Sequence, residues 1–372
     1  MNLHTPAWFG LTALLAFLSV SGWQNGWPLP VVTHLILAVG SFPLILAAMI
    51  YFTPVLTRSG TVPRWITRLP LLAMLAGGIA TIALRQNMDW IGLAIPLAIL
   101  GVAVGLGWTN RRAAKALGGA HPGLAWYQAA LLCLLLGLLA ILTAWLWPEQ
   151  WAPLRMLHRH LNLLGFVGLT AIGTLQVLLP TVASYPDPQV GKRLRFDLRY
   201  ALSGTLLMAA GATSWLWLSG LGLVAWGWVL GQFFWAIRAH YRQILATGGA
   251  ALSLLLALVG FALTLLATLW QGGVLPLPLF IALFLFPLVT GALAHLLPLW
   301  WWPGLPTPRR TAAQQKLARY TLLRVGACWI GGLGMMAESP WAVYWLTGSI
   351  SLFLGQLLGC LWPSNSPPTA NH

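Results

Sequence analysis

Long apolar runs, each of about 20 residues, recur along the whole chain and constrain its fold more than any other feature. Only 7% of the residues are charged and 59% are hydrophobic, a composition that no soluble domain of this size could bury. The sequence therefore predicts an all-α polytopic membrane protein with one domain over residues 1–372. The first run lacks a basic leader and a clear cleavage site, so we expect it to stay as a spanning helix. The twelve predicted spans are 7–23, 30–56, 65–85, 89–108, 124–147, 156–182, 198–218, 220–237, 249–270, 276–301, 318–336 and 341–361.

The basic residues behind the net charge of +15 lie mainly on one side of the predicted membrane. Lysine and arginine concentrate in the predicted loops on one side, which is the positive-inside pattern of a bacterial inner membrane protein. We therefore expect both termini in the cytoplasm, membrane lipid as a partner, and no nucleic acid partner. The clustered basic residues are Arg58, Arg64, Arg68, Arg111, Arg112, Lys115, Lys192, Arg193, Arg195, Arg199, Arg238, Arg242, Arg309, Arg310, Lys316, Arg319 and Arg324.

An internal repeat relates three of the predicted helices, 30–56, 156–182 and 276–301. They align without a gap, and each has a proline near its end. The helix that follows each of them opens on an arginine and an aromatic residue and carries a pair of small residues further on. These features predict three four-helix repeats, at about 1–118, 119–247 and 248–372. The aligned positions are His34, His160 and Pro278, then Pro54, Pro180 and Pro298; in the following helices they are Arg64-Trp65, Arg199-Tyr200 and Arg319-Tyr320, then Ala76-Gly77, Gly211-Ala212 and Gly331-Gly332.

Four histidines lie within or at the edge of the predicted spans: His34, His158, His160 and His295. His34 and His160 occupy equivalent repeat positions near the outer surface. Helical residues two apart point about 200° apart, so only one of His158 and His160 can face His34, and the repeat favours His160. His295 lies about 25 Å deeper at 1.5 Å per residue, so it cannot share one metal with the outer histidines.

Two neutral imidazoles at one depth are the axial ligands that a six-coordinate haem iron needs. We expect haem b on His34 and His160, with copper as a second candidate metal and His295 as a further metal-ligand candidate. His158 is a competing ligand or a partner of a haem propionate, and Arg155 and Arg159 could hold propionates. Interfacial hydrogen bonding explains His158 and the two arginines equally well, and a structural role explains His295. No catalytic residue is assigned.

Several other chemistries are excluded by what the sequence lacks. No carboxylate is expected deep in a helix, because Asp187 and Asp197 are predicted in a loop, so a carboxylate proton relay is not predicted. Cys133, Cys328 and Cys360 stand singly, without a CxxC or CxxCH motif. Walker, nucleophile-elbow and HExxH motifs are also missing, which argues against soluble-style hydrolysis.

Residues 155–180, RMLHRHLNLLGFVGLTAIGTLQVLLP, resemble the haem-ligating second helix in catalytic subunits of nitric oxide reductases and cbb3-type oxidases. The matching residues are Arg155, Met156, His158 or His160, Asn162, Leu163, Gly173 and Pro180. The resemblance implies the fold of the haem–copper oxidase superfamily, with twelve helices in three arcs and cytoplasmic termini. It also implies that His34 stands where the family's low-spin haem ligand stands, near the outer face of the second helix.

This chain departs from the family at the copper site. The family has two adjacent histidines on its seventh helix and a His-x-His near the outer end of its tenth; here 198–218 has no histidine and the tenth helix opens PLPLFIALF. We therefore expect a haem protein that lacks the complete copper site. This protein would transfer electrons, or bind or reduce NO or O2, at a haem on the outer side. Such an oxidoreductase would work with an electron-donor protein or another respiratory subunit. The alternative is a cofactor-free transporter or a respiratory-complex assembly factor, because broken helices and repeats also mark transporters.

Overall fold

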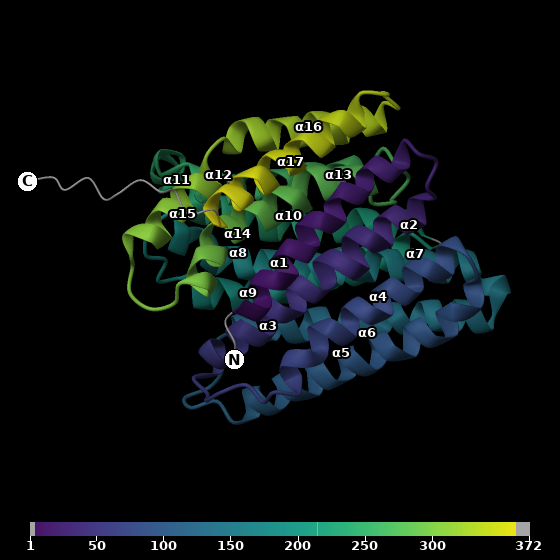
Figure 1. Cartoon of the computed structure of the whole chain (residues 1–372). Coiled ribbons are helices and arrows are strands. Elements are labelled where there is room, and N and C mark those ends of the chain that lie inside the picture. Colours follow the sequence, from purple (N-terminus) through teal and green to yellow (C-terminus); the bar gives the residue numbers. More distant parts are fainter. Residues whose placement is uncertain (1–3, 214, 362–372) are drawn as a thin grey trace, which may run out of the picture.

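The computed structural model describes residues 4–213 and 215–361 of the chain, and all secondary structure in these residues is helical (Figure 1). The α-helices are α1 (His4–Phe17), α2 (Leu29–His34), α3 (Phe42–Thr57), α4 (Leu69–Arg85), α5 (Ile91–Ala114), α6 (Gly123–Leu146), α7 (Trp151–His160), α8 (Leu169–Val182), α9 (Val190–Gly211), α10 (Leu216–Ile237), α11 (Tyr241–Thr247), α12 (Gly249–Ala267), α13 (Leu277–Leu279), α14 (Phe286–Trp301), α15 (Pro308–Ala318), α16 (Thr321–Met336) and α17 (Ala342–Leu361). Short 3-10 segments are η1 (Leu18–Trp23), η3 (Ile66–Arg68), η4 (Met88–Trp90) and η5 (Pro148–Gln150).

Within the described residues, ten continuous helical stretches are long and apolar enough to cross a membrane. The predicted all-α, multi-pass membrane architecture is therefore confirmed. The ten stretches are Pro6–Trp23, Leu29–Thr57, Ile66–Arg85, Met88–Ala114, Gly123–Leu146, Pro148–Val182, Leu216–Ile237, Gly249–Ala267, Leu277–Trp301 and Ala342–Cys360.

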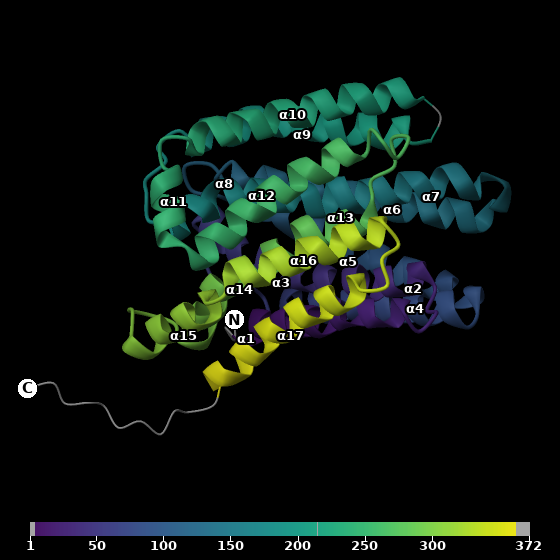
Figure 2. The ribbon, with the colours of Figure 1, turned by 90° about the horizontal axis from the view of Figure 1, so that it is seen from above.

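The other two predicted spans, 198–218 and 318–336, correspond to α9 and α16. The first half of α9 carries four basic residues, and α16 has only 16 residues, so neither reaches the length and apolarity of the ten. Each still packs lengthwise against its successor, α9 against α10 and α16 against α17 (Figure 2). The helix at the predicted span 198–218 begins earlier, at Val190, and ends earlier, at Gly211, where α10 approaches so closely that a Cβ would overlap the backbone of Ser219.

Three of the long helices each contain a π-helical segment. These segments are η2 (Leu35–Ser41) between α2 and α3, η6 (Leu161–Gly168) between α7 and α8, and η7 (Phe280–Leu285) between α13 and α14. They begin one, one and two residues after His34, His160 and Pro278, the positions that the sequence alignment matched. A π-helical turn inserts a residue into the α-helical ladder and is frequent at functional sites.

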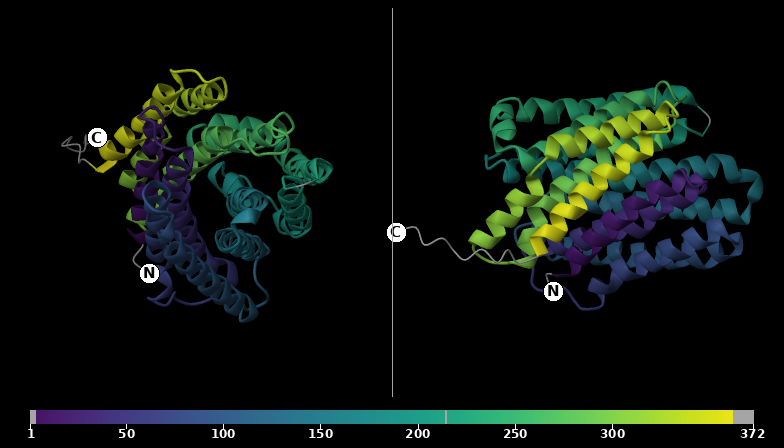
Figure 3. Two further views of the ribbon diagram at one scale, coloured as in Figure 1. Left: turned by 90° about the vertical axis from the view of Figure 1, so that its right-hand side faces the viewer. Right: turned by 45° about the horizontal axis from the view of Figure 1, so that its top comes forward.

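The interior of the bundle is formed by two of the three helices that carry π segments. In the Pro148–Val182 and Leu277–Trp301 stretches, 89% and 83% of the most apolar part is buried, whereas no other stretch exceeds 50%. Figure 3 (left) looks along the helices and shows the teal segment that includes α7 and α8 between the N-terminal helices and the green ones. Neighbouring helices approach the π segments through glycines: a Cβ on Gly77 would overlap the carbonyl group of Ala38, and one on Gly260 that of Leu283.

The bundle has two distinct ends. The left-hand end in Figure 1, called the basic end below, holds α11, α15, the start of α1 and the end of α17. The opposite end, called the histidine end, holds α2, α7 and α13. Two charges at the basic end lie in helices and are fully buried: Asp197 in α9, which was predicted in a loop, and Arg324 in α16, inside the predicted span 318–336. Arg324 is accommodated because Nη1 donates to Gln356 Oε1 at 3.0 Å and its guanidinium lies over Phe353.

Candidate functional site

A cavity of about 300 Å³ opens at the histidine end between the Leu29–Thr57, Ile66–Arg85, Met88–Ala114, Gly123–Leu146 and Pro148–Val182 helices. Its lining is mostly apolar, and this volume lies at the lower end of the range for small-molecule sites. One wall is built from small residues, which leave a smooth surface, and two aromatic rings lie at its inner edge. The small residues are Ala38, Ala73, Ala76, Gly77, Ala80, Ala94 and Ala98; the rings are those of Phe42 and Phe166, in edge contact at 4.9 Å between centroids.

His34 and His158 both line this cavity. His34 Nδ1 lies 2.8 Å from the carbonyl oxygen of Pro30, and His158 Nδ1 lies 2.9 Å from that of Gly137. A carbonyl oxygen only accepts, so each Nδ1 carries the proton and donates it, and each Nε2 keeps its lone pair. Neither Nε2 has a hydrogen-bond partner among the described residues. Metal-ligating histidines in proteins have this arrangement, in which one nitrogen is held by a protein acceptor and the other is free to coordinate.

Asn162 and Gly137 hold His158 in position, and the sequence did not identify either of them as a positioning residue. Asn162 Nδ2 donates to the carbonyl oxygen of His158 at 2.6 Å, one turn further along the helix. Gly137 on α6 allows a close approach, since a Cβ there would lie 2.8 Å from Asn162 Nδ2. The only sign of the contact between Gly137 and Asn162 in the sequence was a glycine within the leucine-rich predicted span 124–147.

His160 does not line the cavity, and the expected pairing of His34 with His160 is not found. His160 is fully buried, with Nδ1 3.0 Å from the carbonyl oxygen of Met156. Its Nε2 lies 3.3 Å from the carbonyl oxygen of Gly273 and 3.4 Å from the amide nitrogen of Leu275. Both ring nitrogens therefore face main-chain groups, and His158 takes the place beside His34.

The two arginines predicted near the site also line the cavity. Arg155 is exposed, so it can place its charge at the mouth. Arg159 is half-buried and donates through Nη2 to the carbonyl oxygen of Leu275, while its Nε has no partner among the described residues. The mouth of the cavity is therefore positively charged, and the two guanidinium groups have N–H donors that could bind an anionic group.

His295 lies apart from the other three candidates. It is half-buried in α14 and lines neither this cavity nor the second one described below. Its backbone carbonyl accepts a hydrogen bond from Gln314 Nε2 at 3.2 Å, which ties α14 to α15. In residues 4–213 and 215–361, no three His, Cys, Asp or Glu side chains gather in a way that could hold a metal ion. The chemistry available at the cavity is therefore that of two neutral imidazole donors.

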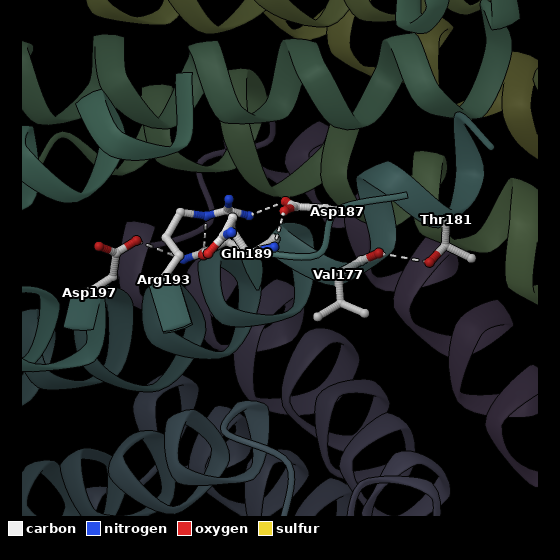
Figure 4. Close-up of polar contacts among 7 residues, drawn as sticks. Val177, Thr181, Asp187, Gln189, Arg193 and Asp197 are labelled. Carbon is white, nitrogen blue, oxygen red and sulfur yellow. Dashed lines mark hydrogen bonds and ion pairs between the residues drawn. The ribbon is translucent and has the colours of Figure 1, made fainter. Parts of the chain in front are cut away.

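A second polar cluster lies at the basic end, where α8 meets the start of α9 (Figure 4). Arg193 donates through Nε to Gln176 Oε1 at 2.8 Å and through Nη2 to Asp187 Oδ2 at 2.7 Å. Gln176 Nε2 in turn donates to Asp197 Oδ2 at 3.3 Å. Arg193 therefore pairs directly with Asp187, and the fully buried Gln176 links it to Asp197, a fully buried carboxylate that was predicted in a loop. We assign this cluster a structural role in joining the two helices.

Replacing Arg193 by alanine is expected to destabilise the protein by about 3 kcal/mol, because it leaves the carboxylate of Asp187 and the buried amide of Gln176 without their cationic partner. Arg195, two residues further along α9, is exposed, so Arg195→Ala removes the same charge from a solvated position and is the matched control. Thermal unfolding of the two purified variants in detergent should show a clearly lower midpoint for Arg193→Ala only. Equal midpoints would show that the cluster contributes nothing to stability.

Comparison with models of known protein families and with curated protein sequences finds no match for this chain. The resemblance to the haem–copper oxidases rests on residues 155–180 and on the predicted helix pattern alone.

Proposed function

We propose that this chain is a haem-binding membrane protein in which His34 and His158 are the axial ligands of one haem. The observation that carries the proposal is that these two histidines line the same mostly apolar cavity, each with Nδ1 held by a main-chain carbonyl and with Nε2 lacking a partner among the described residues. His160, which the sequence favoured, has both nitrogens facing main-chain groups and is assigned a structural role.

The residues at the cavity fit a haem better than a bare metal ion. A porphyrin supplies the equatorial ligands, so two imidazoles complete the coordination of its iron. The small-residue wall suits a planar ring, and Arg155 and Arg159 suit the propionates, which they would bind through charge-assisted hydrogen bonds. Copper would need donors beyond these two imidazoles, and the described residues bring no third His, Cys, Asp or Glu to them. Without a CxxCH motif for covalent attachment, the expected group is haem b.

We further propose the complete topology of twelve spans in three four-helix units, with α9 and α16 completing the ten. The π segments support the threefold repeat, because they start at nearly the same offset from His34, His160 and Pro278. The glycine contacts support the repeat independently. Gly77 packs on Ala38, four residues after His34, and Gly332 packs on Ala282, four residues after Pro278. The architecture agrees with a divergent member of the haem–copper oxidase superfamily.

The orientation proposed from the charges places the basic end in the cytoplasm of a bacterium and the histidine end on the outer side of its inner membrane. A haem held by two histidines supplies one-electron transfer, so electron transfer is the activity best supported. An electron-donor protein or another respiratory subunit at the outer surface is the expected partner. Binding or reduction of NO or O2 needs an open iron position, and it is the second candidate because an apolar cavity adjoins the site.

The test is an absorbance spectrum of the purified protein after reduction with dithionite, together with iron and haem analysis. The protein should be expressed with an ample haem supply. We expect a Soret band and haem approaching one per chain. A colourless, iron-free protein would contradict the proposal and favour the alternative of a cofactor-free transporter or a respiratory-complex assembly factor.

A further inference from the structure

A second cavity, of about 110 Å³, lies between the Leu29–Thr57, Pro148–Val182 and Leu277–Trp301 helices, the three that carry π segments. It begins at the last turn of each π segment, at Ser41, Val167 and Leu285. Each of the three helices then contributes an alanine to the wall, Ala48, Ala171 or Ala292. The cavity is therefore built by equivalent parts of three helices.

The polar groups around this cavity are already bonded to the protein. Ser41 Oγ donates to the carbonyl oxygen of Ile36 at 2.8 Å, and Thr170 Oγ1 to that of Phe166 at 2.7 Å. Tyr127 Oη and Thr174 Oγ1 lie 3.2 Å apart and bond to each other. Among the described lining side chains, only Trp300 has a buried polar atom without a partner, its Nε1. A buried water needs two to four polar partners, so this cavity is a poor site for water.

One described side chain is shared by the linings of the two cavities. Val167 in η6 lines both of them. On the helix opposite, Phe42 lines the first cavity and its neighbour Ser41 lines the second. An apolar molecule small enough to pass an isopropyl group could therefore move between them when Val167 changes its rotamer.

We propose that the second cavity binds one small apolar gas molecule of the size of O2 or NO, with Val167 as the partition toward the first cavity. An engineered apolar cavity of about 150 Å³ stays dry and binds benzene or xenon, so an apolar-lined cavity of about 110 Å³ has room for a diatomic gas. The gas site rests on the cavity alone. Its role as a store that supplies the first cavity rests on the second candidate function, in which one position of the haem iron is open to NO or O2.

Xenon is the probe that tests the gas site. A structure of the whole protein determined under xenon pressure should show one xenon between Val167, Ala171 and Ala292. Ala292 lines the second cavity and not the first, so Ala292→Leu fills the space and should abolish xenon binding. Ala171→Leu fills the same space from another helix and serves where the first variant does not fold. Val167→Ala should let xenon density extend into the first cavity.

An empty or water-filled second cavity in the wild-type protein, at a pressure that fills an engineered cavity of similar size, would overturn the gas site. Persistent xenon in a folded Ala292→Leu or Ala171→Leu protein would also overturn it. The haem content of the same preparation is measured separately. Xenon in a haem-free protein upholds the gas site and contradicts the proposed function, whereas a haem-loaded protein without xenon contradicts the gas site alone.

Discussion

His158→Ala is expected to lose most of the bound haem, and His34→Ala is expected to do the same. Each substitution removes one of the two imidazoles that line the cavity. The loss is large because one imidazole alone would remain, and among the other described lining residues only Met156 carries a side chain of a common haem-ligand type. The measurement is the height of the Soret band per mole of protein after purification, with the thermal midpoint as a check on folding.

His160→Ala is the matched control for this prediction. The residue lies two positions away on the same helix, is more deeply buried than His158 and does not line the cavity. Its loss should lower the stability through unpaired main-chain groups near Gly273, but haem per folded chain should stay near the wild-type value. Haem lost in His160→Ala and retained in His158→Ala would reverse the assignment of the ligand.

Gly260→Ala is expected to prevent most of the protein from folding into its native bundle. A Cβ at this position would overlap the carbonyl group of Leu283, in the π segment of the helix beside it. A carbonyl group cannot rotate away as a flexible side chain can, so α12 would have to separate from η7. Overpacking of this kind typically costs about 1 to 3 kcal/mol and more where backbone must move, and we expect the upper end. The measurement is the yield of monodisperse protein in detergent and its thermal midpoint.

Gly231→Ala on α10 is the control, because a Cβ there meets no atom within 4 Å. Alanine is favoured over glycine in a helix by about 1 kcal/mol, so this variant should be as stable as the wild type or slightly more stable. Similar yields and midpoints for Gly260→Ala and Gly231→Ala would show that the close contact between α12 and η7 does not exist.

The spanning helices were largely predictable from the sequence, because crossing a bilayer requires an apolar run that the composition displays directly. The ends of α9 were not predictable in the same way. Its basic first half reads as a loop, and only the buried contacts of Arg193 with Gln176 and Asp187 explain why those residues are helical and packed. Hydropathy cannot show that a charge is compensated by a residue distant in sequence.

The proposed ligand pair, His34 and His158, could not be chosen from the sequence alone. Helical geometry implied that only one of His158 and His160 could face His34, and His158 is the one that lines the same cavity. The choice of His160 relied on equal repeat positions, but positions related by rotation around a ring point toward successive neighbours and not toward each other. His34 faces the cavity beside the Pro148–Val182 helix, and His160 faces Gly273 and Leu275, just before the Leu277–Trp301 helix. The π segments were also not predicted from the sequence, because no residue pattern indicated them.

The central claim is that one haem iron is held between the imidazoles of His34 and His158. The electron paramagnetic resonance spectrum of the oxidised, purified wild-type protein tests it most directly, since two imidazole ligands give low-spin ferric haem. We predict a low-spin spectrum for the wild type and for His160→Ala, with loss of that signal in His158→Ala. A haem-loaded wild-type protein with a purely high-spin spectrum, or a low-spin signal that survives in His158→Ala, would contradict the claim.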